Sequence, residues 1–262
     1  MTAAVKPPEV ASIKSINKKL TANVGSRGLN EVFSDFCHMS ALAIRNSVDL
    51  NGRADREERY LTMAKNYTPE QMRRFAEALS DVTSMLEAEF SDVLGRLFMS
   101  LELGSSSMGQ FFTPYEVSLL MAQMQVDTMV EHCKTEEFVT LSEPTCGSGG
   151  MVVAVAESLR SAGVNFQQQL HVTAQDLSAT AVHMAYIQLS LIGVPAVVIH
   201  GDTLAVECRE AWFTPMHILG GWSRKMRHRS AHHPALEVMT EAPEPMAEPV
   251  DLWDSVFAEV AS

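Results

Sequence analysis

The sequence predicts an α/β fold in which a parallel sheet follows an all-helical N-terminal region. From residue 110 onward, apolar runs such as "EFVTL", "LHVTAQD" and "AVVIH" alternate with segments of helical pattern, as in strands joined by crossover helices. A glycine-rich turn, "EPTCGSGG" at residues 143–150, joins the first of these runs to the next helical segment. Before residue 104, apolar residues recur instead at the spacing of helix faces.

Composition and charge narrow the class of protein. A chain of 262 residues with 46% hydrophobic residues can bury the core of one large domain or two smaller ones. A formal net charge of −12 argues against tight nucleic-acid binding by this chain alone, because such binding requires basic side chains that neutralise the phosphates. The sequence shows no apolar signal core and no run long enough to span a bilayer, so we expect a cytoplasmic protein without a membrane partner.

The cysteines give no sign of a metal site or a disulfide framework. The four are widely spaced and form no CxxC pair, which also suits a reducing compartment. Cys146 lies within the glycine-rich turn, but no histidine is placed in the sequence to activate it. We therefore expect Cys146 to pack in the turn rather than to act as a nucleophile.

Helices account for the N-terminal region. Residues 1–27 are polar and lysine-rich and are expected to form a flexible leader. Residues 29–48 place apolar side chains along one helix face, and the charged stretch 51–60 is expected to be a turn. Thr68 is the expected N-cap of a helix with Pro69 at its first position; it continues to residue 103 with a break near residue 91. The helical domain is assigned to residues 28–104.

The strand–helix alternation occupies residues 105–204, and the remaining residues 205–262 depart from it. Residues 224–233 form a basic run, which is either a phosphate-contact patch or, as we prefer, a solvated and partly disordered surface stretch. "EAPEPMAEP" is an acidic, proline-rich linker, and "VDLWDSVFAEV" is a short segment of amphipathic pattern. This divergent C-terminal segment is not expected to extend the parallel sheet.

Two common nucleotide motifs fail at the glycine-rich turn. A dinucleotide fingerprint that begins at Gly147 would need a third glycine where the chain has Val152. A P-loop would need a lysine followed by serine or threonine, and "GSGGMV" has neither after its glycines. The turn is therefore expected to hold some other ligand, or simply to reverse the chain.

Four motifs in order give the turn a context. They are "GQFFTPYEV" at residues 109–117, the turn itself, "AQD" at the end of the second strand and "HGDTL" after the third. This set resembles the S-adenosylmethionine domain of adenine-N6 DNA methyltransferases, and is most similar to the modification subunit of type I restriction systems. The resemblance covers about residues 92–204. It implies a class I S-adenosylmethionine-dependent methyltransferase sheet, Rossmann-like and here truncated, after the helical domain.

The resemblance also implies how the cofactor would be held. Gly147 and Gly149 would let the backbone approach the methionine moiety, and Asp176 would take the ribose hydroxyls. Asp202 would take the adenine amino group, and residues 110–115 would pack across the cofactor. Glu143 stands where the family has aspartate. The expected cofactor-binding residues are Gln110, Phe111, Phe112, Thr113, Pro114, Glu143, Thr145, Cys146, Gly147, Gly149, Asp176 and Asp202. Taken singly, several have simpler explanations: Asp176 as a cap of the helix that opens at Ser178, the glycines as a tight turn.

The family's catalytic motif, (N/D/S)PP(Y/F), has no counterpart in this chain, and "WFTP" at residues 212–215 is the nearest aromatic and proline cluster. No catalytic residue is therefore assigned. The first hypothesis is an S-adenosylmethionine-dependent adenine-N6 DNA methyltransferase-like protein that does not catalyse alone. It would reach DNA through a partner, such as a methyltransferase or specificity subunit, or act as a homo-oligomer. The alternative is a non-catalytic cofactor-binding or regulatory partner of a methyltransferase, and a DNA-mimicking decoy is a more distant third.

Overall fold

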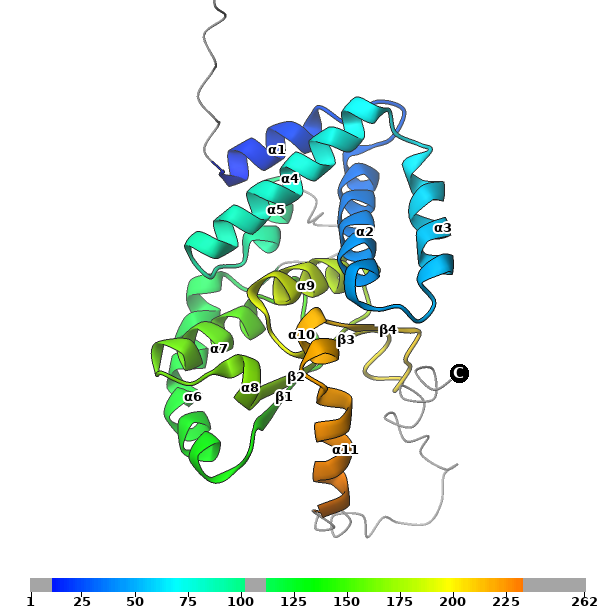
Figure 1. The fold of residues 1–262 in the computed structure, drawn as a ribbon. Coiled ribbons are helices and arrows are strands. Elements are labelled where there is room, and N and C mark those ends of the chain that lie inside the picture. Colours follow the sequence, from blue (N-terminus) through cyan, green and yellow to red (C-terminus); the bar gives the residue numbers. More distant parts are fainter. Residues whose placement is uncertain (1–10, 102–111, 233–262) are drawn as a thin grey trace, which may run out of the picture.

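The computed structural model describes residues 11–101 and 112–232 (Figure 1). Five helices come first, and a small sheet with its covering helices follows. The helices of the N-terminal region are α1 (Ile13–Thr21), α2 (Leu29–Val48), α3 (Arg53–Ala64), α4 (Pro69–Ala88) and α5 (Val93–Ser100). In the described ranges, no helix is long and apolar enough to cross a membrane.

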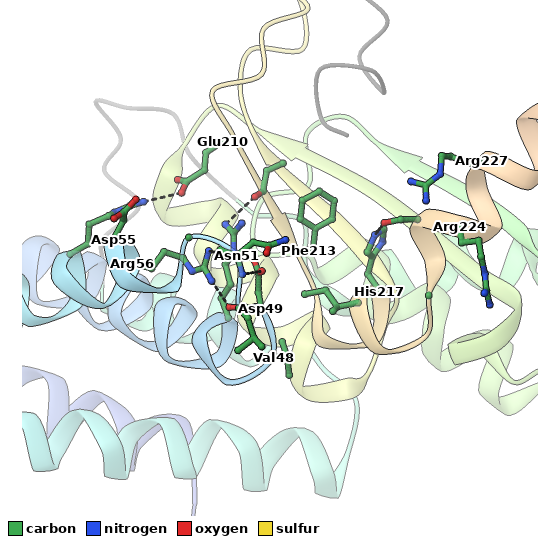
Figure 2. A pocket seen from close by; sticks show the side chains of 18 residues that line it. Val48, Asp49, Asn51, Asp55, Arg56, Glu210, Phe213, His217, Arg224 and Arg227 are labelled. Atoms are coloured by element: carbon green, nitrogen blue, oxygen red, sulfur yellow. Dashed lines mark hydrogen bonds and ion pairs between the residues drawn. The ribbon is translucent and has the colours of Figure 1, made fainter. Parts of the chain in front are cut away.

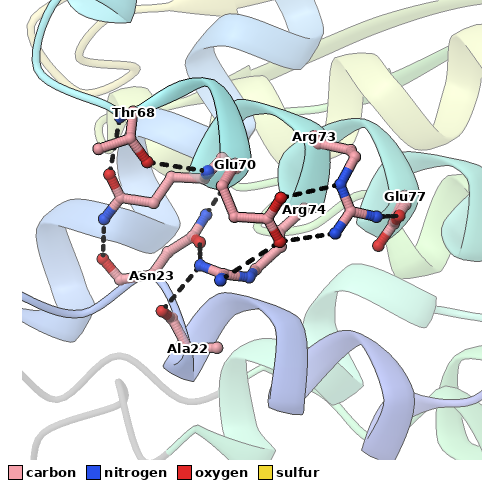
Figure 3. Close-up of polar contacts among 8 residues, drawn as sticks. Ala22, Asn23, Thr68, Glu70, Arg73, Arg74 and Glu77 are labelled. Atoms are coloured by element: carbon pink, nitrogen blue, oxygen red, sulfur yellow. Dashed lines mark hydrogen bonds and ion pairs between the residues drawn. The ribbon is translucent and has the colours of Figure 1, made fainter.

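The start of α4 follows the expected capping pattern. The Gln71 backbone N–H donates to Thr68 Oγ1 over 3.2 Å, and the Thr68 N–H donates back to Gln71 Oε1 over 2.8 Å. Figure 3 shows this cap beside Asn23, whose side chain donates to the Gln71 carbonyl. Ion pairs that join Glu70 to Arg73 and Arg74 follow on the exposed face of the first turns. The cap thus starts α4 and also fixes the end of α1 against it. The expected break is also confirmed, since α4 ends at Ala88 and α5 begins at Val93.

Two parts of the N-terminal region differ from expectation. Residues 13–21, expected within a flexible leader, form α1, because Ile16 and Leu20 give this polar segment a fully buried edge. Residues 53–64, mostly expected as a turn, form α3, whose Arg56 is buried. Arg56 donates to the Asn46 side chain and pairs with Asp49, both on or next to α2. A charged side chain can be buried when it is paired with a residue on a neighbouring helix. Such pairing cannot be seen by counting charges along the sequence.

The sheet has four strands in the order β1-β2-β3-β4. They are β1 (Val139–Glu143), β2 (Leu170–Asp176), β3 (Ala196–His200) and β4 (Glu210–Phe213). The first three are parallel, while β4 runs antiparallel to β3. The helix α6 (Tyr115–Thr135) precedes β1, and the helices between the parallel strands are α7 (Gly150–Ser161), α8 (Phe166–Gln169) and α9 (Ala179–Ile192). The predicted α/β fold, with a helical region before it, is confirmed.

The segment after β3 departs from the alternation, as expected, but it is more ordered than the sequence indicated. After β4 come α10 (Pro215–Leu219) and α11 (Trp222–His232). The basic run was expected to be a solvated, partly disordered stretch, yet its first part lies in α11. Trp222 explains the difference: it is fully buried, with its ring 5.0 Å from that of Phe138. The acidic linker and the segment "VDLWDSVFAEV" lie outside the described residues.

Two buried histidines connect the sheet to α10 and α11. His171 Nε2 of β2 lies 2.9 Å from His217 Nδ1 of α10, and His217 Nε2 lies 2.9 Å from Ser223 Oγ. Only 1% and 2% of these two residues is exposed. Burial lowers the pKa of His171 to about 3, with a further contribution from His217, and lowers the pKa of His217 to about 4. Both rings are therefore neutral in the folded protein at physiological pH.

We predict that the protein loses stability as the pH falls below the ordinary histidine pKa of 6.5. The unfolded chain then binds protons that the folded chain excludes, so stability is complete above pH 6.5 and declines toward pH 4. Each histidine contributes up to about 2 kcal/mol to the loss at pH 5. Urea unfolding at pH 7.5, 6.5 and 5.5 measures it. In His217→Gln the free energy of unfolding should fall less steeply as the pH is lowered. An unchanged pH dependence in this variant would contradict the role given to the buried histidines.

Candidate functional site

The carboxyl ends of β1, β2 and β3 meet at one edge of the sheet, and their loops are bonded to one another. The Cys146 N–H donates to the Gln175 carbonyl over 2.8 Å, which ties the glycine-rich turn to the end of β2. The Gly201 N–H donates to the Asp176 carbonyl over 3.0 Å. Thr203 Oγ1 donates to the carbonyl of Pro144 over 2.7 Å. The three loops therefore form one continuous surface, where ligands bind in open α/β sheets.

The glycine-rich turn needs its glycines for two physical reasons. Gly147 and Gly149 have φ angles of +53° and +90°, which residues other than glycine rarely adopt. Both also lie against neighbours. A Cβ on Gly147 would stand 2.8 Å from the ring of Phe112, and one on Gly149 would stand 3.2 Å from Cα of Ala185. The turn thus lies between the segment before α6 and the middle of α9.

A buried carboxylate fixes this turn from behind. Asp92 is only 3% exposed and accepts three hydrogen bonds: from Ser148 Oγ over 2.6 Å, and from Gln188 Nε2 and the Gly95 N–H over 2.9 Å each. The same Gln188 amide donates to the Ser148 carbonyl over 2.7 Å. The network joins α5, the turn and α9. This network could not be predicted from the sequence, because nothing in the spacing of Asp92, Ser148 and Gln188 connects them.

Asp176 has one hydrogen bond on each carboxylate oxygen. Oδ2 accepts from the Gly147 N–H over 2.9 Å, and Oδ1 accepts from the Ser178 N–H over 2.8 Å. Asp176 is not itself the helix cap: the cap of α9 is Ser178, whose Oγ accepts from the Ala181 N–H, and Asp176 holds the N–H of that cap residue. A carboxylate oxygen has two lone pairs, so each of the two retains capacity for a further donor. Asp176 is only half-buried and lies directly beside the glycine-rich turn.

Asp202 organises the loop after β3 in a similar way. Its Oδ1 accepts from the backbone N–H groups of Leu204 and Ala205, over 2.9 and 3.2 Å. The residue is half-buried, while the two that it caps are exposed. Asp202 is placed by the same loop that bonds to Pro144 through Thr203. It therefore belongs to the same surface as Asp176 and the turn.

The segment before α6 is described only from residue 112. Phe112 is half-buried, lies against Gly147, and has its ring centroid 5.1 Å from that of Phe98. Thr113 and Pro114 are exposed, and Pro114 precedes the first residue of α6. Gln110 and Phe111, also expected to bind the cofactor, lie outside the described residues.

Three other predicted residues lie in or beside the turn. Glu143 ends β1, and its Oε1 accepts from the Thr145 N–H over 3.4 Å, a long hydrogen bond on the exposed side. Cys146 is buried, and burial raises the pKa of its thiol well above the usual value, with Asp176 and Glu143 adding to the shift. A protonated, buried thiol suits packing rather than nucleophilic attack. In the ranges that the structure describes, no group of three or more metal-ligating side chains is arranged to hold a metal.

A separate pocket of ≈ 850 Å³ lies between the α2–α3 corner and β4, α10 and α11 (Figure 2). It is lined by charged residues, but Arg45, Arg56 and Arg59 are already paired. Arg45 and Arg56 share Asp49, at 3.0 and 3.4 Å, and Arg59 pairs with Glu210 at 3.1 Å. None of its lining residues comes from the three strand-end loops. We interpret this pocket as the seam between the helical region and the edge of the sheet.

We predict that Gly95→Ala destabilises the protein by about 1–3 kcal/mol through overpacking of the Asp92 network. A Cβ at this position would lie 2.0 Å from Asp92 Oδ2 and 2.6 Å from Ser148 Oγ. Gly25→Ala is the matched control, since nothing lies within 4 Å of its added Cβ. Chemical denaturation of the two variants measures the difference. Equal stabilities for both would show that the Asp92 network is not closely packed.

Comparison with known proteins places this geometry in a family. The family described as N-6 DNA Methylase matches residues 90–220, half of the chain. No curated protein sequence matches. A proposed class I S-adenosylmethionine-dependent methyltransferase from Listeria monocytogenes is 12% identical, with a TM-score of 0.40, over 73% of this chain and 54% of that one. A type I restriction-modification methyltransferase subunit from Streptococcus thermophilus is 20% identical, with a TM-score of 0.37, over 78% and 41%.

The chain thus spans about half the length, or less, of these two solved proteins. The family match includes α5 with Asp92, the glycine-rich turn, both strand-end aspartates and β4. It ends as α10 ends, before α11. The protein belongs to the N-6 DNA methylase family.

Proposed function

We propose that the three strand-end loops bind S-adenosylmethionine, and that this chain is the cofactor-holding part of an adenine-N6 DNA methyltransferase. The observation that carries the proposal is the contact between the glycine-rich turn and Asp176, where the Gly147 N–H donates to the carboxylate beneath the ring of Phe112. This contact joins three of the four motifs expected to surround the cofactor, which come from distant parts of the chain.

The polar groups of the site fit this cofactor in type and number. The remaining acceptor capacity of Asp176 would take the two ribose hydroxyls, because each carboxylate oxygen has one free lone pair. Backbone N–H groups at the start of α7 would meet the methionine carboxylate, and the helix dipole favours a negative charge there. Asp202 would accept from the adenine amino group through the oxygen that does not cap its own loop. When bound, the cofactor supplies an electrophilic methyl group.

Residues 212–215, the nearest aromatic and proline cluster in the sequence, support a division of labour with a partner. Trp212 is fully buried and packs on Tyr186 and His183. Thr214 Oγ1 donates to the Val194 carbonyl and accepts from the Ala196 N–H. These side chains are committed to the core and to the start of α10. We propose that the groups that hold the target adenine come from a partner methyltransferase or specificity subunit, which would also bring the DNA.

A non-catalytic regulatory role is the second candidate. The same buried cluster favours it, because in the described part of the chain "WFTP" presents no ring or amide to a flipped base. The two candidates share cofactor binding and differ only in whether methyl transfer occurs in the assembled complex.

We predict that isothermal titration of the purified chain with S-adenosylmethionine detects binding that weakens at least about tenfold in Asp176→Ala, or about 1.4 kcal/mol. The loss follows from removing the acceptor for the ribose hydroxyls. Asp55→Ala, an exposed carboxylate on α3, is the matched control and should bind normally. Circular dichroism checks that each variant is folded. Absence of binding by the unmodified, folded chain would overturn the cofactor assignment.

We further predict that the purified chain transfers no labelled methyl group to adenine-containing duplex DNA, although it binds the cofactor. Adding a candidate methyltransferase or specificity subunit should produce transfer if the chain is part of an enzyme. If the chain changes the rate of a methyltransferase that is already active by itself, the regulatory role is favoured. If the chain changes no transfer rate in any mixture, neither the enzymatic nor the regulatory role is supported. Transfer by the chain alone would refute the proposed division of labour.

A further inference from the structure

An apolar stripe on α6 is exposed along two helical turns. Val117, Leu120, Met121 and Met124 are 45%, 59%, 44% and 78% exposed. Their spacing of i, i+3, i+4 and i+7 puts them on one face of the helix. The opposite face of α6 packs on α7 through buried residues such as Ala122. Figure 1 shows α6 on the flank of the molecule, alongside α7.

The stripe is free of charge as well as exposed. Residues 117–126, "VSLLMAQMQV", contain no charged side chain, although Glu116 and Asp127 lie immediately on either side. Single exposed apolar residues are ordinary on a protein surface, but a contiguous set on one helix face marks a binding surface. The part of the chain that the structure describes leaves this surface uncovered.

A complementary pattern occurs near the C-terminal end of the sequence. In residues 250–260, "VDLWDSVFAEV", the residues Trp253, Val256, Phe257 and Val260 have the same i, i+3, i+4, i+7 spacing. Asp251 and Asp254 lie off that face. Helices pack when the side-chain ridges of one face fit into the grooves of another, and two apolar faces of similar length suit such packing.

The fold brings the two patterns within reach. Arg229 of α11 donates to the Phe138 carbonyl over 2.8 Å and pairs with Glu136 at 3.9 Å, so the end of α11 lies beside the end of α6. From Glu136 back to Met124 is about 18 Å along the helix. The chain from His232 to Trp253 spans up to about 70 Å when extended, far more than this path requires.

We propose that residues 250–260 pack as a helix on the α6 stripe of the same chain, with Trp253, Val256 and Phe257 against Leu120, Met121 and Met124. The contact is apolar, since the stripe carries no charge, and rising salt does not weaken it. The docked segment braces the start of α6, which directly follows the Phe112 segment over the glycine-rich turn. It does not depend on the proposed cofactor or reaction.

Paired cysteines test the contact directly. In a Cys208→Ser background, Met124→Cys with Phe257→Cys should form a disulfide within one chain, seen as a faster-migrating monomer on non-reducing gels and confirmed by peptide mass. The matched control pairs Phe257→Cys with Leu61→Cys, an exposed apolar position on α3, and should remain reduced. A covalent dimer as the main product would assign the stripe to a second copy and overturn the proposal. Equal crosslinking at both positions would overturn it as well.

Tryptophan fluorescence gives a second readout without crosslinking. Trp212 and Trp222 are fully buried, so acrylamide quenching of the third tryptophan, Trp253, dominates any change. Leu120→Glu with Met124→Glu should release Trp253, with stronger quenching and a red-shifted emission, while Leu61→Glu should change neither. The exposed positions of these substitutions leave the fold intact, which circular dichroism verifies. Identical quenching in both variants would contradict the proposal.

Discussion

A single buried carboxylate, Asp92, ties the helical region to the glycine-rich turn and to α9. Asp92 must be satisfied where it lies, because an unpaired charge of 3% exposure costs several kcal/mol. Its donors come from the start of α5, from Ser148 in the glycine-rich turn and from Gln188 on α9. Moving any of these elements would cost the buried carboxylate at least one of its three hydrogen bonds, which favours a single spacing between them. Gly95 and Gly150 permit that spacing, since a Cβ on either would stand 2.9 Å or less from the carboxylate.

The candidate site depends on this arrangement. With the back of the turn held by Asp92, its front is held by Asp176, and the ring of Phe112 covers Gly147. The turn is therefore positioned from three directions before any ligand arrives, which limits the ordering that binding would cost. Arginine side chains also satisfy backbone carbonyls at the two edges of the sheet. Arg45 donates to the Ala211 carbonyl of β4, and Arg229 donates to the Phe138 carbonyl just before β1. A small sheet is thus held by side chains from helices that lie far away in the sequence.

Much of the fold could be predicted from local pattern. Short-range signals account for the range of β2, the cap at Thr68 and the helix ends at Gly163 and Gly193, because apolar runs, capping residues and glycines act within a few residues. The cap of α9 was assigned to Asp176 in the sequence, but it is Ser178. Elements whose partners lie far apart in the sequence were not predicted. The helices α1 and α3 are stabilised by burial against other helices, and α11 is stabilised by the burial of Trp222. The candidate site divides the same way, since Asp176 and Asp202 end or follow strands, while Asp92 is 56 residues from its serine partner.

The central claim is that the turn, Asp176 and Asp202 form one binding surface for S-adenosylmethionine. Titration of the 15N-labelled chain with the cofactor, followed through assigned backbone amide resonances, tests this most directly. We expect saturable shifts of the Gly147 and Gly149 amide resonances, together with those of Ser178 and Leu204, whose N–H groups donate to the two aspartates. Shifts confined to residues around the arginine-lined pocket, or no shifts at all, would contradict it.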